Sequence, residues 1–249
     1  KSYFLNRIIS HPFYNLALVF SNYGASLYNF SVGQSYYTNY TYKGVNETKI
    51  TAGAFSPTGK KVVICSIFVE IYLFDVTLAA PHQCLRMFLN GIANSIIWSN
   101  ADTSLIVSYT TRNGSQRLAQ INTLTSDLIS IPINHNIYGI INVMQIDRFR
   151  EYLAYGTKNG KAIILDVYNN YSTIFLHCFQ KAEVLSIAIS NDLIAFGSSE
   201  GELILLNSEN FNQMTIVNVR FPILSIVILN DKILLAGNNK SIELLKSQK

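Results

Sequence analysis

Charged side chains are scarce in this chain of 249 residues: they make up 14%, whereas globular proteins usually have about 25%. Cysteine is also rare, and Cys65, Cys84 and Cys178 lie far apart, which excludes a disulfide scaffold and a short-spaced zinc or redox motif. Long apolar runs are missing as well. The strongest, Ile223–Leu229, spans seven residues, far fewer than the ~18 of a membrane helix.

The apolar content is nevertheless high, at 49%, with a mean hydropathy of +0.22. These residues must therefore lie in short, buried elements, and no convincing helical periodicity is present, which excludes a coiled coil. The net charge of +4 is too small to indicate a nucleic-acid-binding protein. The odd cysteine count favours an intracellular, reducing setting. Because the sequence begins at Lys1 rather than Met, we expect it to be part of a longer protein.

A repeated pattern of short strands and turns runs along the sequence. Its clearest copy is Ala54–Lys61, then Val62–Ser66, then Glu70–Val76, which predicts strand, turn, strand, turn and strand. Pro57 and Gly59 supply turn conformations in the first connection. Asn-Gly and Glu-Gly pairs occupy the corresponding turns farther along the chain.

The copies recur with a period of about 40–45 residues, typical of the four-stranded blade of a β-propeller. Matching third-strand positions, separated by 44, 47, 44, 41 and 39 residues, are Phe30, Phe74, Ile121, Leu165, Leu206 and Leu245. The sequence therefore predicts an all-β fold: a single propeller domain over residues 1–249 with six four-stranded blades. The predicted blades span residues 6–42, 50–89, 94–133, 140–180, 184–219 and 223–249, with residues 1–5 as a candidate closing strand.

The pattern resembles the WD-repeat family. Phe55–Lys60 followed by Leu73–Val76 looks like the first-strand and third-strand signatures of that family, and Ile164–Val167 repeats the latter. No unit ends in Trp-Asp, although Asp75 and Asp166 survive at that place, and the Gly-His pair is absent. We therefore do not expect this chain to form the hydrogen-bond network of that family. Two closures stay open: a six-bladed ring, or a ring completed by upstream sequence or by a partner.

Motifs of catalysis and cofactor binding are missing. Gly53–Lys61 has five residues between its glycines and a second Lys in place of Ser or Thr, so it is a turn and not a phosphate-binding loop. The histidines fall at unrelated positions of the blades: His11, His82, His135 and His177. We expect no catalytic residue, cofactor or metal, and an enzyme of propeller fold is the least favoured hypothesis.

One rim of the predicted propeller carries the candidate partner site. This upper rim consists of the turns between second and third strands and of the connections between blades. Ile67–Val69 is an apolar turn where other blades have Asn-Gly or Glu-Gly, although a longer second strand with Phe68 in the core stays open. The candidate residues combine aromatic and basic side chains: Ile67, Phe68, Val69, Arg112, Tyr138, Lys158, Lys161, Arg220 and Phe221.

These observations favour a non-catalytic scaffold subunit of an intracellular multiprotein complex, which binds protein subunits or peptides through rim loops and blade edges. The alternative is a propeller that binds nucleic acid or an anionic lipid through a basic upper rim. That alternative predicts binding that weakens steeply with salt. Neither hypothesis involves a transmembrane segment.

Overall fold

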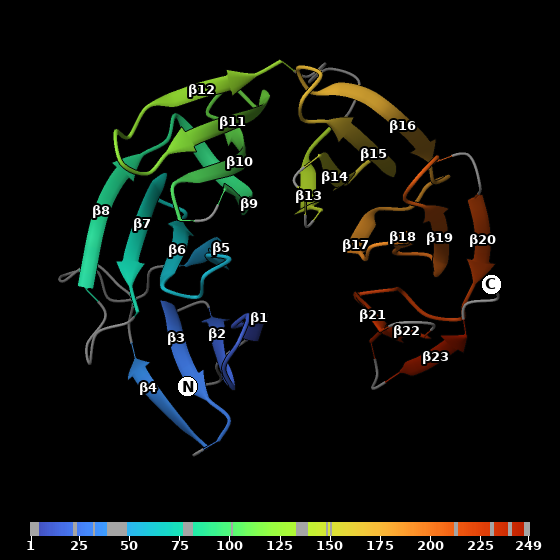
Figure 1. Ribbon diagram of the computed structural model, residues 1–249, viewed down its shortest axis with the longest axis horizontal. Helices are drawn as coiled ribbons and strands as arrows, with labels where there is room; N and C mark the ends of the chain where they lie inside the picture. The colour runs from blue at the N-terminus through green and yellow to red at the C-terminus, as the bar shows by residue number, and fades with distance from the viewer. Residues whose placement is uncertain are drawn as a thin grey trace. The chain divides into compact units, whose positions relative to one another are not determined.

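Strands account for all the regular structure in the described part of the chain. The computed structural model describes residues 5–21, 24–31, 33–38, 49–76, 82–100, 102–132, 139–147, 149, 151–211, 214–229, 232–238 and 241–246. These residues form 23 β-strands, most joined by short turns (Figure 1). The chain divides into two compact units, Lys1–Ser130 (unit 1) and Ile131–Lys249 (unit 2).

Unit 1 contains three antiparallel sheets of four strands, each with its strands in chain order. Sheet 1 is β1 (Leu5–Ser10), β2 (Leu16–Ser21), β3 (Gly24–Asn29) and β4 (Gln34–Thr38). Sheet 2 is β5 (Ile50–Phe55), β6 (Lys61–Ser66), β7 (Glu70–Asp75) and β8 (His82–Phe88). Sheet 3 is β9 (Gly91–Asn100), β10 (Ser104–Thr111), β11 (Gln116–Asn122) and β12 (Leu128–Ile131).

Unit 2 follows the same plan. Sheet 4 is β13 (Ile141–Ile146), β14 (Tyr152–Thr157), β15 (Lys161–Asp166) and β16 (Ser172–Cys178). Sheet 5 is β17 (Val184–Ile189), β18 (Leu193–Ser198), β19 (Glu202–Asn207) and β20 (Met214–Asn218). Sheet 6 has three strands within the described residues: β21 (Ser225–Leu229), β22 (Lys232–Ala236) and β23 (Ile242–Lys246). The prediction of an all-β fold with six repeated sheets is confirmed.

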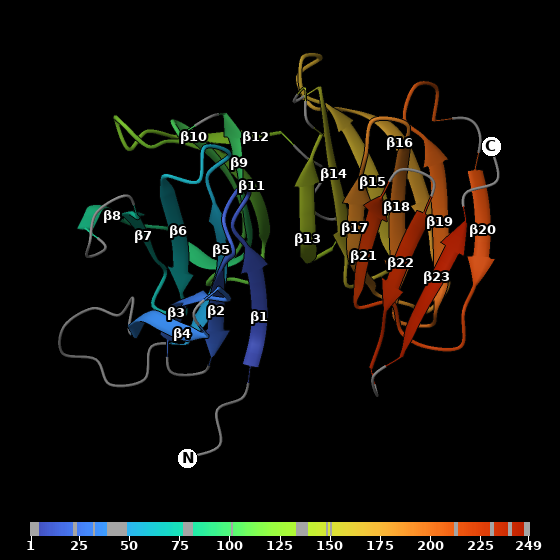
Figure 2. The same cartoon turned by 60° about the horizontal axis from the view of Figure 1, so that its bottom comes forward.

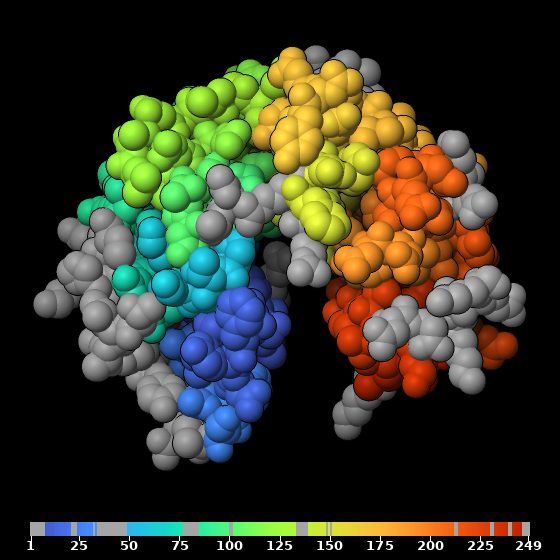
Figure 3. All heavy atoms as spheres, in the orientation of Figure 1, coloured from blue at the N-terminus to red at the C-terminus, as the bar shows by residue number. Residues whose placement is uncertain are grey.

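Consecutive sheets pack face to face within each unit. In unit 2 the first strand β17 contacts both β13 and β21, between which it lies in Figure 2, and in unit 1 β5 contacts both β1 and β9. Side chains fill the space between the ribbons of neighbouring sheets within each unit (Figure 3). The second strands β6, β14 and β18 are buried along almost their whole length, so side chains on both of their faces are shielded from water. This two-sided burial explains the scarcity of charge.

Most of the predicted third-strand positions lie in the core. Phe74, Ile121, Leu165 and Leu206 are buried, but Phe30 follows the end of β3 and is 58% exposed. The prediction was wrong for Phe30 because β3 ends one residue earlier, and Leu27 is the residue of this strand that packs between sheets 1 and 2. The proposed closing strand is not tested: Leu5 begins β1 and pairs with Ser21, and residues 1–4 lie outside the described ranges.

In four of the sheets, the side chain of the Asn or Asp that ends the third strand stabilises the turn that follows. In each case Oδ1 accepts a hydrogen bond from the backbone N–H two residues later, at 2.8–3.0 Å. The four residues are Asn29, Asn122, Asp166 and Asn207. This arrangement is an Asx turn, which either side chain forms equally well. Asp166, singled out in the sequence for its resemblance to the WD signature, therefore has a structural role.

Polar contacts link neighbouring sheets of unit 1 at the lower rim, the end of the sheets where first and second strands meet. His11 Nε2 donates to the Gly59 carbonyl oxygen at 3.0 Å, which joins the β1–β2 turn to the β5–β6 turn. Thr58 Oγ1 donates to the Asp102 carboxylate, with oxygen–oxygen distances of 2.6 and 2.7 Å, and Lys61 Nζ donates to the Asp102 carbonyl. Three successive turns are thereby held together.

The described residues contain no helix that is long and apolar enough to cross a membrane.

Candidate functional site

The predicted partner-binding residues that the structure describes lie in turns, at the start of a strand, or in connections between sheets. Ile67–Val69 and Arg112 lie in the β6–β7 and β10–β11 turns of unit 1. In unit 2, Lys158 lies in the β14–β15 turn and Lys161 begins β15, whereas Arg220 and Phe221 lie between β20 and β21. Tyr138 falls outside the described residues.

The turn Ile67–Val69 presents an aromatic side chain on an unusual backbone. β6 ends at Ser66 and Phe68 is 49% exposed, so the alternative with Phe68 in the core is wrong. Val69 has a φ of 62°, a conformation that a β-branched residue rarely adopts. The residues that precede the third strands of sheets 4 and 5 are glycines, Gly160 and Gly201, with φ of 79° and 83°. Sheet 2 therefore keeps a bulky side chain where sheets 4 and 5 have glycine.

A charged network lies directly beside this turn. Glu70, the first residue of β7, accepts hydrogen bonds from the Tyr72 hydroxyl and from the Arg86 guanidinium. Burial raises the pKa of Glu70, but these bonds and the positive charge of Arg86 outweigh burial, so the pKa lies below its usual value. Burial and the bond to Glu70 raise the pKa of Tyr72. The carboxylate is therefore charged and paired at neutral pH.

Arg86 also stacks on an exposed aromatic ring. Its guanidinium carbon lies 5.1 Å from the ring centroid of Phe88, which is 64% exposed. Glu70 pairs with Phe88 and Tyr72 with Arg86 across β7 and β8, so all four side chains share one face of sheet 2. We call Phe68, Arg86 and Phe88 the sheet-2 corner. Sequence analysis found Phe68 from its turn but missed the other two, since nothing in a fourth strand distinguishes such residues before the register is known.

The upper rim of unit 2 has charges of both signs. Lys158 and Lys181 line a depression of about 390 Å³ between sheets 4 and 5, and Glu183 lines it as well. Lys161 Nζ lies 2.7 Å from Cys178 Sγ. Arg220 is exposed, whereas Phe221 is half-buried and packs on the core between sheets 5 and 6. Phe221 therefore contributes to packing more than to an open surface.

Groups that bind metals are not assembled in the part of the chain that the structure describes, since no three His, Cys, Asp or Glu side chains meet there. His11 is buried at the lower rim, where its Nδ1 accepts hydrogen bonds from the backbone N–H groups of Phe13 and Tyr14. His177 Nε2 lies 3.8 Å from the Glu202 carboxylate. Cys65 is fully buried, and this burial raises its thiol pKa.

The fold of the chain is similar to that of solved structures, whereas the two sequence comparisons found no match. No protein-family model matches the chain, and no curated protein matches it. Among solved structures, Sqt1 of Saccharomyces cerevisiae is similar with a TM-score of 0.70 and 13% sequence identity, over 99% of this chain and 85% of Sqt1. At this identity the likeness shows the fold alone. Together with the six successive antiparallel sheets, it establishes that the chain has the fold of a β-propeller.

Proposed function

We propose that the chain is a non-catalytic protein-interaction module that serves as a scaffold subunit of an intracellular multiprotein complex. The observation that carries this proposal is the sheet-2 corner, where Phe68 is about half exposed in the β6–β7 turn and Phe88 is about two-thirds exposed beside Arg86. Aromatic residues and arginine dominate the binding energy of protein interfaces. A propeller fold suits this role because it presents loops and strand edges on rigid sheets.

The backbone of Val69 supports the same proposal. A left-handed conformation costs an L-amino acid about 1–2 kcal/mol, and glycine would avoid this cost. Strained residues that persist where a less strained one is available are frequent at binding sites. Such a conformation persists only where the surrounding structure imposes it, so the backbone of Val69 indicates that its surroundings position the tip of the β6–β7 turn, which carries Phe68.

Blade edges supply a second kind of surface. β23 carries Ile242 and Leu244, which are 70% and 57% exposed, in a sheet that has three strands within the described residues. An apolar edge strand favours pairing with another chain. We include this edge in the proposed interaction role.

Affinity purification of the tagged protein from its own cells tests the proposal. The variant Phe68→Ser/Phe88→Ser removes both exposed rings of the sheet-2 corner. The matched control Phe13→Ser/Leu124→Ser removes two apolar side chains of unit 1 that are more exposed still, at 70% and 73%, from the β1–β2 and β11–β12 turns. We expect wild type and control to co-purify with a stoichiometric set of subunits that the first variant loses.

The outcomes separate the hypotheses. A protein that purifies alone, or with nucleic acid or lipid that moderate salt removes, would contradict the scaffold role. Retention of every subunit by the Phe68→Ser/Phe88→Ser variant would exclude the sheet-2 corner as the contact surface. Equal thermal melting of the variants and wild type shows that the losses do not come from unfolding.

A further inference from the structure

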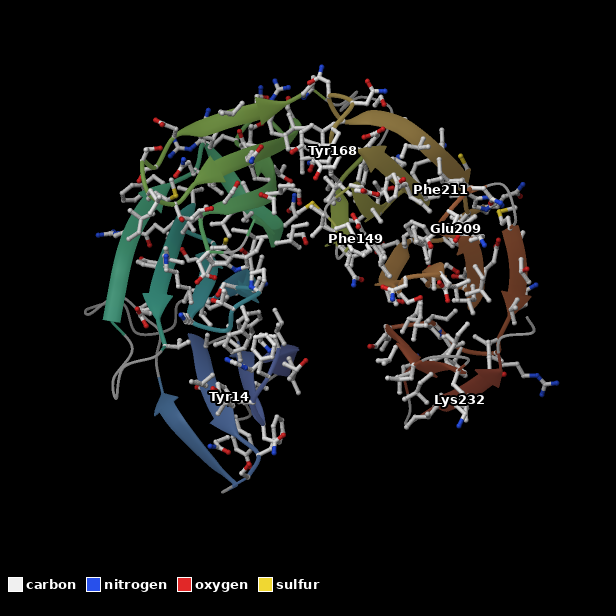
Figure 4. All side chains as sticks on the ribbon, in the orientation of Figure 1. Tyr14, Phe149, Tyr168, Glu209, Phe211 and Lys232 are labelled. Carbon is white, nitrogen blue, oxygen red and sulfur yellow. The ribbon has the colours of Figure 1, made fainter. Side chains whose placement is uncertain are left out.

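A depression on the lower rim of unit 2 lies outside all the residues discussed so far as partner sites. It has a volume of about 360 Å³ and lies between sheets 4 and 5. Its walls come from the β13–β14 turn, the β17–β18 turn and the β19–β20 connection. Figure 4 labels three side chains of these segments: Phe149, Glu209 and Phe211.

The inner wall of the depression is apolar and rigid. Ile194 is fully buried beneath it, and Ile189 and the ring of Tyr152 line it. Phe211 packs edge-on against Tyr152, with ring centroids 5.0 Å apart and ring planes at 81°. This contact between sheets 4 and 5 fixes the position of the Tyr152 ring. At the mouth, Phe149 exposes 66% of its surface. A flat or aliphatic group in the depression would therefore cover apolar surface that is now in contact with water.

Carboxylates stand on two sides of the depression. Glu151 comes from sheet 4 and Glu209 from sheet 5, and both are exposed. Asp147 also lines the depression, but its two oxygens accept hydrogen bonds from the N–H groups of Phe149 and Tyr152, each at 2.7 Å. Asp147 thus shapes the turn, whereas Glu151 and Glu209 face solvent across the opening.

The electrostatic environment of Tyr152 agrees with this distribution of charge. Its hydroxyl pKa is raised, first by burial and then by the negative charges of Glu151, Asp166 and Asp147. A negative potential with an aromatic wall is complementary to a cation that is planar and weakly hydrated.

We propose that this depression binds an arginine side chain of a partner protein. The guanidinium has five N–H donors in a plane, which allows it to bond to carboxylates on two sides while its face stacks on an aromatic ring. Lysine offers a compact, strongly hydrated charge that uses the aromatic wall less well. This inference rests on the proposed interaction role, but it concerns a surface of unit 2 that is distinct from the sheet-2 corner.

Fluorescence anisotropy with a labelled hexa-arginine peptide tests the inference. The variant Glu151→Gln/Glu209→Gln removes both carboxylates with little change of shape. The matched control Glu183→Gln/Glu200→Gln removes two exposed carboxylates from the upper rim of the same unit, so the net charge changes equally. We expect the Kd of the first variant to rise about tenfold or more and that of the control to stay within about twofold of wild type.

Two further comparisons identify what the depression recognises. Hexa-lysine should bind the wild-type protein more weakly than hexa-arginine, and Phe149→Ala should reduce that preference because it removes the exposed ring. Arg148 and Arg150 flank Phe149 in the sequence but lie outside the described residues. Replacing both with Gln should leave the peptide affinity unchanged or increase it, since the change removes two positive charges that repel the cationic peptide.

Several results would overturn the inference: no binding by the wild-type protein, equal losses in the two double variants, equal binding of the two peptides, or weaker binding after Arg148 and Arg150 are replaced. A protein that keeps its co-purifying subunits through Phe68 and Phe88 but ignores the peptide would refute this inference and leave the proposed function standing.

Discussion

The lower-rim turns of the two units solve the same packing problem differently. In unit 1, His11, Gly59, Thr58 and Asp102 join three successive turns by direct polar contacts. In unit 2, the corresponding turns of sheets 4 and 5 border a depression, and the aromatic pair Tyr152–Phe211 connects the sheets beneath it. Side chains committed to neighbouring turns are not available to a ligand. The lower rim of unit 1 therefore contributes to stability, whereas the lower rim of unit 2 is available to a ligand.

The upper-rim turns show the opposite preference. In sheet 5, Gly201 has a φ of 83°, and an added Cβ would lie 2.3 Å from the Val219 carbonyl oxygen. In sheet 2, Val69 occupies the same place with a φ of 62°. Here unit 2 has the relaxed turn and unit 1 the strained one. Among the turns between second and third strands, the left-handed non-glycine residue therefore lies in sheet 2, whereas sheets 4 and 5 have glycine.

Among the variants considered, substitutions at Gly201 and Val69 should have the largest effect on stability. Gly201→Ala forces both the left-handed backbone and a backbone clash, so we expect the free energy of unfolding to fall by roughly 2–4 kcal/mol. Val69→Gly removes the strain of the folded turn but increases the conformational entropy of the unfolded chain. The net effect that we expect is a rise of about 0.5–1 kcal/mol in the free energy of unfolding. Urea unfolding measures both. Destabilisation by Val69→Gly would show that the turn is not strained.

Removing the carboxylate that joins two turns of unit 1 should have an intermediate effect. Asp102→Ala leaves the Thr58 hydroxyl without its acceptor, and we expect a loss of about 1.5–3 kcal/mol. The matched variant is Asp192→Ala, which removes an exposed Asp from the β17–β18 turn of unit 2 and should change stability by less than about 0.5 kcal/mol. Equal losses in thermal or urea unfolding would remove the contrast between the two lower rims.

The buried histidine should make the unit 1 lower rim sensitive to acid. His11 Nδ1 accepts two backbone N–H groups and Nε2 donates to Gly59, so only the neutral ring satisfies both. Burial lowers its pKa from 6.5, although the bond to Gly59 raises it in part. The stability that His11 provides is therefore complete above pH 6.5 and is lost as the pH falls through the lowered value.

The variant His11→Gln isolates this titration. It should lose about 1 kcal/mol at pH 8, because two hydrogen bonds are weakened, and it should lose less additional stability than wild type between pH 7 and pH 5. Urea unfolding across this pH range measures the difference. Parallel curves for the two proteins would show that His11 does not titrate in the folded state.

The repeated sheets could be predicted because their signal is local. Alternating turns and apolar strands of about six residues recur along the chain, and four of the second strands, β6, β10, β14 and β18, are buried along most of their length, so the pattern survives despite low sequence similarity. The error at Phe30 also has a local cause. An aromatic residue just after a strand looks like part of it until the Asx turn at Asn29 shows that the strand has ended.

The functional surfaces were harder to predict because they depend on register and on neighbouring sheets. Phe68 stood out as an apolar residue in a turn, but Phe88 and Arg86 become neighbours of Glu70 and Tyr72 only through the pairing of β7 with β8. The depression in unit 2 combines residues from three connections, and its first and last lining residues, Asp147 and Glu209, are more than 50 residues apart in the sequence. No spacing rule links Asp147 to Glu209.

The Asx turns at Asn29, Asn122, Asp166 and Asn207 bear on how such a chain evolves. Each turn depends on one side-chain oxygen, which Asn and Asp supply equally. Substitution between the two changes the letters of a repeat while preserving its hydrogen bond. Copies of a duplicated blade can therefore diverge in sequence without losing their shape. The sequence similarity that records their common origin is lost before the similarity of their backbones.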